Sequence, residues 1–190
     1  MKIVPGLLGA CLLLTACSEP GPTTPPPTVT VTAPATPPTV DPATLGWLDG
    51  FCSAIHDYRK RNNTEAVPGT SAPGSVEEAQ RALSRELGGL ADRTGEVVDR
   101  LKALPPAPAP LAETVRKAFI QKYTTAHDRA RDAKAALDGA KPGDAASQDP
   151  AWNALNQAQQ DIDGTYDPVA PLAESPELLT AAASAPGCKA

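Results

Sequence analysis

Two histidine–aspartate dipeptides are the clearest candidates for chemistry in this 190-residue chain. His56 precedes Asp57, His127 precedes Asp128, and the sequence contains no other histidine. A histidine can act as a general base, and two such pairs could together hold a metal ion. Consecutive residues on a helix point about 100° apart, however, so the members of one pair would not meet at one ion. We therefore expect solvated or capping roles for these four residues, with a metal site or an enzyme using the pairs as the alternative.

A second candidate is the acidic segment from Gln159 to Ala170, which partly matches a calcium-binding loop. Its residues suit the third, fifth, sixth and ninth positions of such a loop: Asp161, Asp163, Gly164 and Asp167. The twelfth position needs a bidentate glutamate and is Ala170 instead. An acidic helix end is the better interpretation of this segment.

Several aromatic residues could line a ligand cavity: Trp47, Phe51, Tyr58, Trp152 and Tyr166. Their helical spacing favours a place in the core instead. The sequence contains no glycine-rich phosphate loop and no GxSxG, HExxH or CxxC motif. We therefore expect neither catalytic activity nor a cofactor.

The N-terminus carries the most specific signal in the chain. Lys2 precedes an apolar run that is too short to span a bilayer of about 30 Å. An aliphatic residue, two small residues and a cysteine end this signal: Leu14, Thr15, Ala16 and Cys17. In these four residues the chain resembles bacterial lipoproteins, whereas an ordinary secretory signal has no need of the cysteine. The resemblance covers residues 1–17 only.

The resemblance implies removal of residues 1–16 as a signal peptide and attachment of diacylglycerol to Cys17. The protein would then be held by lipid on the extracytoplasmic side of the cell membrane, since two acyl chains suffice for stable anchoring. Residues 17–40 are rich in proline and threonine and would form an extended tether reaching on the order of 70 Å. Residues 41–190 remain as one domain of ordinary size.

Net charge excludes one class of partner. The formal charge of the chain is −5, and removal of Lys2 with the signal peptide would make it −6. An acidic protein lacks the basic footprint that nucleic-acid binding requires, and it is not attracted to anionic lipids. We expect no nucleic-acid partner and contact with the membrane only through the lipid on Cys17.

Cysteine usage points to a disulfide. Cys11 lies in the predicted signal peptide and Cys17 is the predicted lipidation site, which leaves Cys52 and Cys188. In an exported protein we expect these two to pair and to close a loop of about 136 residues. The alternative is a buried Cys52 and a reactive thiol at Cys188.

Helical periodicity dominates residues 41–190, and no segment there has a convincing strand pattern. Helix starts are predicted at five residues or dipeptides: Asp41-Pro42, Ser75, Pro110, Asp149-Pro150 and Ser175. The first helix is expected to end at Arg61 and the fourth near Pro168. Apolar residues at helical spacing predict the core face of the second helix: Val76, Ala79, Leu83, Leu87, Leu90, Thr94, Val97, Leu101 and Leu104. Trp152 and Tyr166 are predicted on the core face of the fourth.

These elements predict an all-α fold: an antiparallel four-helix bundle with a short extra C-terminal helix, closed by the Cys52–Cys188 disulfide. Basic residues between Arg116 and Lys134 should face the acidic fourth helix. A tethered helical head without a catalytic set suggests a binding or interaction module of the cell envelope. Its partner could be an envelope protein, a transporter or a wall polymer. The alternatives are a helical lipoprotein that binds a small molecule or metal, and an enzyme that uses the His/Asp pairs.

Overall fold

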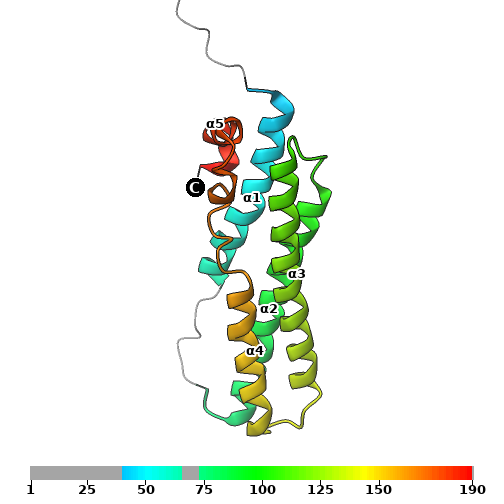
Figure 1. Ribbon diagram of the computed structural model, residues 1–190. Coiled ribbons are helices and arrows are strands. Elements are labelled where there is room, and N and C mark those ends of the chain that lie inside the picture. The colour runs from blue at the N-terminus through cyan, green and yellow to red at the C-terminus, as the bar shows by residue number, and fades with distance from the viewer. Residues whose placement is uncertain (1–39, 66–72, 190) are drawn as a thin grey trace, which may run out of the picture. The chain divides into compact units, whose positions relative to one another are not determined.

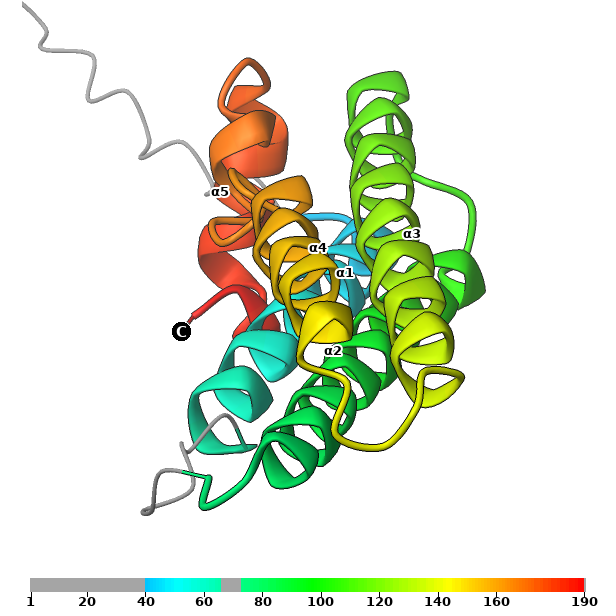
Figure 2. The same cartoon turned by 90° about the horizontal axis from the view of Figure 1, so that it is seen from below.

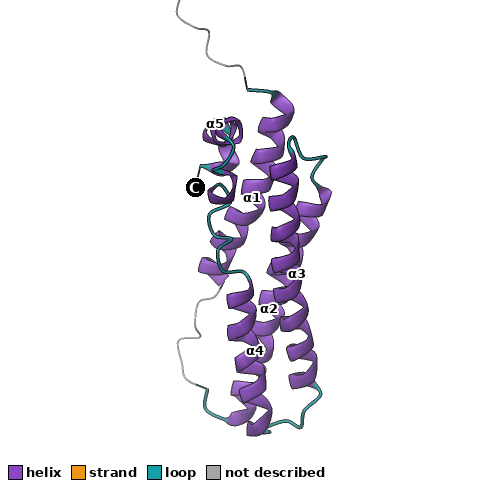
Figure 3. Ribbon diagram, in the orientation of Figure 1, coloured by secondary structure: helices purple, strands orange, loops and turns teal. Residues whose placement is uncertain are grey.

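The computed structural model describes residues 40–65 and 73–189, and these ranges contain helices joined by loops, without a strand (Figure 1, Figure 3). The α-helices are α1 (Pro42–Glu65), α2 (Val76–Ala103), α3 (Pro110–Asp138), α4 (Gln148–Asp161) and α5 (Pro176–Ser184). Three short 3-10 helices join them: η1 (Ala145–Ser147), η2 (Ala170–Leu172) and η3 (Pro186–Cys188). The all-α prediction is therefore confirmed. The predicted signal peptide, lipidation site and tether lie outside the described residues, apart from Val40.

The helices pack around one apolar core. α2 lies along α3, and α4 lies against both (Figure 1, Figure 2). α1 packs on α2 and on the C-terminal elements α5 and η3. The largest fully buried side chains come from α1, α2, α3, the end of α4 and η2: Trp47, Phe51, Leu87, Leu101, Tyr123, Leu137, Ile162 and Leu172 among others. These contacts are consistent with the predicted antiparallel four-helix bundle, which stays a prediction.

α1 begins as predicted but continues further. The Asp41 carboxylate accepts hydrogen bonds from the backbone N–H of Thr44 at 2.9 Å and from its hydroxyl at 3.0 Å, which caps the helix. These bonds lower the pKa of Asp41. The helix was expected to end at Arg61, yet it runs on to Glu65. Arg61 forms an ion pair with Glu96 of α2, and this partner on a neighbouring helix supports the additional turn.

α2 has the predicted capping residue with one change in partner. The Ser75 hydroxyl accepts a hydrogen bond from the Glu78 N–H at 3.2 Å. The Glu78 carboxylate reaches back and accepts a hydrogen bond from the N–H of Gly74, the residue before Ser75, at 2.7 Å. Most of the predicted core face of α2 is buried, from Leu87 onward. Arg93 was expected outside this face and is nevertheless only 6% exposed.

α3 and α4 are paired partly by charge, as predicted. Arg129 of α3 donates to the Asp161 carboxylate at 2.7 Å, and Lys122 donates to the backbone carbonyl of Asp163. The buried positions of α3 lie at helical spacing: Ala112, Val115, Phe119, Tyr123, Ala126, Ala130 and Leu137. Of the basic residues between Arg116 and Lys134, Arg129 and Lys122 contact the end of α4 and the segment that follows it, whereas Arg131 and Lys134 pair with aspartates of α3 itself. The predicted pairing by charge is therefore confirmed for two residues.

α4 is shorter than predicted. It ends at Asp161, whereas the periodicity suggested a helix as far as Pro168. Gly164 has a φ of 79°, a left-handed conformation that glycine adopts readily and that cannot continue an α-helix. Thr165 turns back to donate its hydroxyl to the Ile162 carbonyl at 2.7 Å. Tyr166 therefore leaves the helix and is 40% exposed rather than in the core.

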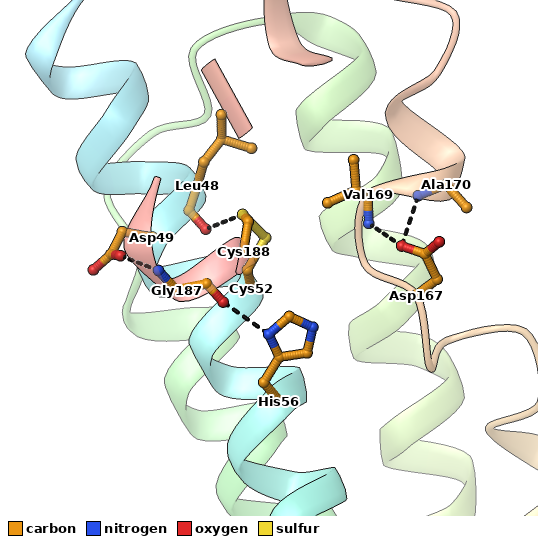
Figure 4. Close-up of a disulfide and its surroundings, with 9 residues drawn as sticks. All are labelled: Leu48, Asp49, Cys52, His56, Asp167, Val169, Ala170, Gly187 and Cys188. Atoms are coloured by element: carbon orange, nitrogen blue, oxygen red, sulfur yellow. Dashed lines mark hydrogen bonds between the residues drawn. A yellow bond between two sulfur atoms is a disulfide. The ribbon is translucent and has the colours of Figure 1, made fainter. Parts of the chain in front are cut away.

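The C-terminal segment is fastened to α1 (Figure 4). A disulfide joins Cys52 of α1 to Cys188 of η3, with a Cα–Cα distance of 4.9 Å, which confirms the predicted pairing. The preceding Gly187 donates its N–H to Asp49 Oδ1 at 2.6 Å and receives a hydrogen bond from His56 Nδ1 at 2.8 Å. We call this set of contacts between α1 and η3 the C-terminal clasp.

Candidate functional site

The two His–Asp pairs do not form a common site. His56 binds the Gly187 carbonyl in the C-terminal clasp, and His127 Nδ1 lies 2.8 Å from the Ala91 carbonyl of α2. Each aspartate faces an arginine instead. Asp57 pairs with Arg100 at 2.8 Å, and Asp128 pairs with Arg131 at 3.1 Å. All four residues therefore have structural partners, whereas we expected solvated or capping roles.

The calcium-like segment is likewise committed to local contacts. Asp161 pairs with Arg129, and Asp167 Oδ1 accepts from the backbone N–H groups of Val169 at 2.9 Å and Ala170 at 3.1 Å (Figure 4). Asp167 thereby caps η2. Among residues 40–65 and 73–189, no three His, Cys, Asp or Glu side chains gather as a metal site would require.

The aromatic residues separate into a buried group and an exposed pair. Trp47 stacks on Phe51 with ring centroids 5.0 Å apart, and Tyr58 meets Tyr123 edge to face at 5.3 Å. Burial raises the pKa of both tyrosine hydroxyls, to about 12 for Tyr123. These rings fill the core, as predicted. Trp152 does not: it is 55% exposed, which contradicts its predicted place in the core.

An open groove lies beside Trp152, between the beginnings of α2 and α4. We call it the Trp152 groove, and its volume is about 390 Å³. Its lining is mostly apolar and includes two carboxylates: Pro73, Ala79, Ala82, Leu83, Glu86, Gln148, Asp149 and Trp152. At this groove of the described chain, side chains that were predicted to be buried lie next to charged side chains that have no counter-ion.

The floor of the groove is the uncovered beginning of the core face of α2. Leu87 and Leu90 on this face are 0% and 2% exposed. Leu83 and Ala79, one and two turns earlier, are only partly buried. Val76, another turn back, is 43% exposed. The same apolar stripe therefore passes from the core into solvent as it approaches the N-terminus of α2.

Buried polar contacts hold this end of α2 in place. The Gln80 side chain is 7% exposed, and its amide nitrogen donates to the Leu137 carbonyl at 3.0 Å while its oxygen accepts from the Gly143 N–H at 2.9 Å. Gln148 donates to the Val76 carbonyl at 2.9 Å. Sequence reasoning missed Gln80, because an isolated glutamine beside the apolar stripe gives no sign that both of its amide atoms will be used.

The groove carries net negative charge. Glu86 and Asp149 lie on its rim, and neither forms an ion pair with another residue of the described ranges. A larger groove of about 690 Å³ between α3 and α4 differs in this respect. Its aspartates, Asp128 and Asp132, both contact Arg131, and its Arg129 contacts Asp161.

Comparisons of the chain with protein-family models, curated proteins and solved structures gave no match. Among the helices of residues 40–65 and 73–189, none is both long and apolar enough to cross a membrane. The chain's own residues must therefore supply the argument for its function.

Proposed function

We propose that this protein is a cell-envelope lipoprotein, anchored through Cys17, whose helical head binds a partner outside the cytoplasm. The disulfide between Cys52 and Cys188 is the observation that carries this proposal. Disulfides persist in oxidising compartments and are rare in the cytosol. The bond therefore supports export, which is what the signal-like N-terminus with its lipobox requires.

Lipid attachment would explain membrane association without a spanning helix. Cleavage before Cys17 would leave a mature chain whose two acyl chains enter the outer face of the cell membrane. The acidic head would not be drawn to anionic lipid, so its surface would stay available to other partners. Residues 17–40 would separate the head from the membrane.

A binding role suits the head better than catalysis does. The two histidines are held by backbone carbonyls, and their neighbouring aspartates pair with arginines on other positions. General base catalysis needs such groups directed at a substrate. The head instead offers an open apolar groove on a helical scaffold, and an exposed apolar patch with a polar rim is typical of an interaction site.

We propose further that α1, α2, α3 and α4 form an antiparallel bundle, with α5 as the extra helix at its side. Short connections between successive helices and the packing of α2 on α3 and of α3 on α4 support this arrangement.

The anchor can be tested by expressing the full-length precursor in a bacterial host. We expect the wild-type chain to enter the membrane fraction and to begin, by mass spectrometry, at a diacylated Cys17. Cys17→Ala should abolish acylation and release the protein from the membrane. Cys11→Ala is the matched control and should change neither property, because residue 11 lies in the predicted leader. An unmodified Cys17 in the wild-type protein would refute the proposal.

A further inference from the structure

We propose that the Trp152 groove docks a basic, partly apolar segment of a partner protein, with a lysine or arginine of that segment against the Trp152 ring. This inference names a partner class for the proposed binding head and rests on that proposed function. The groove itself is formed by residues that the structure describes.

Apolar side chains are exposed at the Trp152 groove. Val76 and Trp152 are 43% and 55% exposed, although helical periodicity places both on core-facing stripes. Leu83 and Ala79 lie between them on the floor of the groove, only partly covered. Burying a large apolar side chain contributes roughly 1.5–3 kcal/mol, so an apolar segment that covered this floor would gain binding free energy.

The charge on the rim of the Trp152 groove distinguishes among apolar partners. Asp149 precedes Trp152 by three residues on α4, so the two side chains share one face of that helix. Glu86 stands in the same relation to Leu83 on α2. Two carboxylates without counter-ions thus flank an exposed indole ring. A cation over an indole ring is attracted by its electron-rich face, and nearby carboxylates add to that attraction.

Two other possible occupants fit the charge of the groove less well. Residues 66–72 adjoin the groove in sequence at Pro73, but their sequence, Ala-Val-Pro-Gly-Thr-Ser-Ala, contains no charged residue that could neutralise the rim. A second copy docked groove to groove about a two-fold axis would bring the carboxylates of both copies together, which is unfavourable. A basic segment of a different protein satisfies both the apolar floor and the acidic rim.

The groove lies away from the residue at which the tether would join the helical head. α2 and α4 both begin at the end of the helices opposite Pro42, where α1 starts (Figure 1). A chain anchored through Cys17 would enter the helical head at Pro42. The groove would therefore lie at the end remote from the point of attachment.

The protein contains its own reporter for a test. Its two tryptophans differ in exposure, because Trp47 is 1% and Trp152 is 55% exposed. Acrylamide quenching of the mature chain, residues 17–190 with Cys17→Ser, should therefore act chiefly on Trp152. The probes are an amphipathic Leu/Lys peptide and a Leu/Glu peptide of the same length and pattern. We expect the Leu/Lys peptide to protect Trp152 from acrylamide and the Leu/Glu peptide to have no effect.

Matched variants separate docking from general attraction to an acidic protein. Glu86→Gln/Asp149→Asn should weaken binding of the Leu/Lys peptide roughly fivefold, because it removes both rim charges. Asp128→Asn/Asp132→Asn removes the same charge from the groove between α3 and α4 and should leave binding within about twofold. Trp152→Ala should abolish binding of the Leu/Lys peptide, as measured by calorimetry. Equal weakening by both double variants would overturn the proposal, as would equal binding of the two peptides or no binding of either.

Two further outcomes would assign the groove to another occupant and so reject a basic partner. If residues 66–72 protect Trp152 from acrylamide better than a Gly/Ser segment of the same length in their place, residues 66–72 are the occupant of the groove. Self-association that Trp152→Ala removes, measured by sedimentation, would identify a second copy. None of these experiments uses the lipid. Failure of the proposed lipid anchor and failure of the proposed docking site can therefore be told apart.

Discussion

Gly187 occupies a position in the C-terminal clasp where a side chain has no room. Its N–H and carbonyl are both bonded to α1, to Asp49 and His56. A Cβ at this residue would lie 2.2 Å from Ser53 Oγ and 2.4 Å from the Asp49 carbonyl oxygen. The second of these atoms belongs to the backbone of a helix and cannot move aside easily.

Gly187→Ala should therefore lower the free energy of unfolding by about 1–3 kcal/mol, the usual cost of overpacking. Urea denaturation measures this change. Gly46→Ala is the matched control in α1, because a Cβ there would meet nothing within 4 Å beyond its chain neighbours and the nearby backbone of its own helix. This control should be neutral or stabilise the protein by up to about 1 kcal/mol, since alanine favours a helix. Equal stability of the Gly187→Ala and wild-type proteins would contradict the geometry of the clasp.

The buried tyrosines make stability depend on alkaline pH. Burial raises the pKa of Tyr123 from 10.0 to about 12, and it raises that of Tyr58 as well. Between these pH values the unfolded chain releases protons that the folded protein retains. The contribution of the tyrosines to the free energy of unfolding should therefore be constant below pH 10 and fall above it, by up to about 1.4 kcal/mol per pH unit for each tyrosine.

Urea denaturation at pH 8, 10 and 11 tests this dependence. In Tyr123→Phe the decline should be shallower, because one of the two groups that retain protons is gone. Tyr166→Phe should reduce the decline less: burial raises the pKa of this hydroxyl too, but the ring is 40% exposed. A decline above pH 10 of the same steepness in wild type and Tyr123→Phe would show that Tyr123 does not contribute to it.

At the scale of single helices, the starts of α1, α2, α3 and α5 were predictable, whereas the ends of α1 and α4 were not, and α4 begins at Gln148 rather than at Asp149-Pro150. Asp41, Ser75 and Ser175 each accept a hydrogen bond from the N–H three residues on, a local contact written in the sequence. α1 continues past Arg61 to Glu65, and Arg61 pairs with Glu96 of another helix, a contact that no local pattern reveals. The end of α4 depends on the backbone conformation of Gly164.

The candidate site was unpredictable for a related reason. Helical spacing identifies which face of α2 and α4 is apolar, and it did so correctly for Leu87 and Leu155. It does not reveal how far along that face the neighbouring helix extends. Trp152 was therefore expected in the core and lies exposed at the groove. The disulfide, in contrast, followed from the number of cysteines left to pair.

The cap of α2 offers a prediction at this scale. Ser75→Ala removes the hydroxyl that accepts from the Glu78 N–H and should cost about 0.5–2 kcal/mol of stability. Hydrogen exchange should locate the loss in the first turns of α2, beside the Trp152 groove. Ser184→Ala, at the last residue of α5, is the control and should have a smaller effect. Faster exchange spread evenly over all helices would argue against a local role.

At the scale of the whole molecule, the disulfide constrains the unfolded chain. It joins residues 136 apart, and the chain-entropy estimate for such a loop is about 5 kcal/mol. Reduction should therefore lower the melting temperature by many degrees, as calorimetry with and without reductant would measure. Cys52→Ala/Cys188→Ala should melt near the reduced wild type and should not respond to reductant. An unchanged melting temperature on reduction would mean that the clasp holds without the bond.

The same bond makes residues 52–188 a covalent circle. A protease that cuts once anywhere between these cysteines opens the circle but releases no fragment. The piece that follows the cut stays joined through Cys188 to Cys52, and through Cys52 to the N-terminal part of the chain. If Cys17 carries the lipid, a nicked head would remain attached at the cell surface with both of its pieces in place.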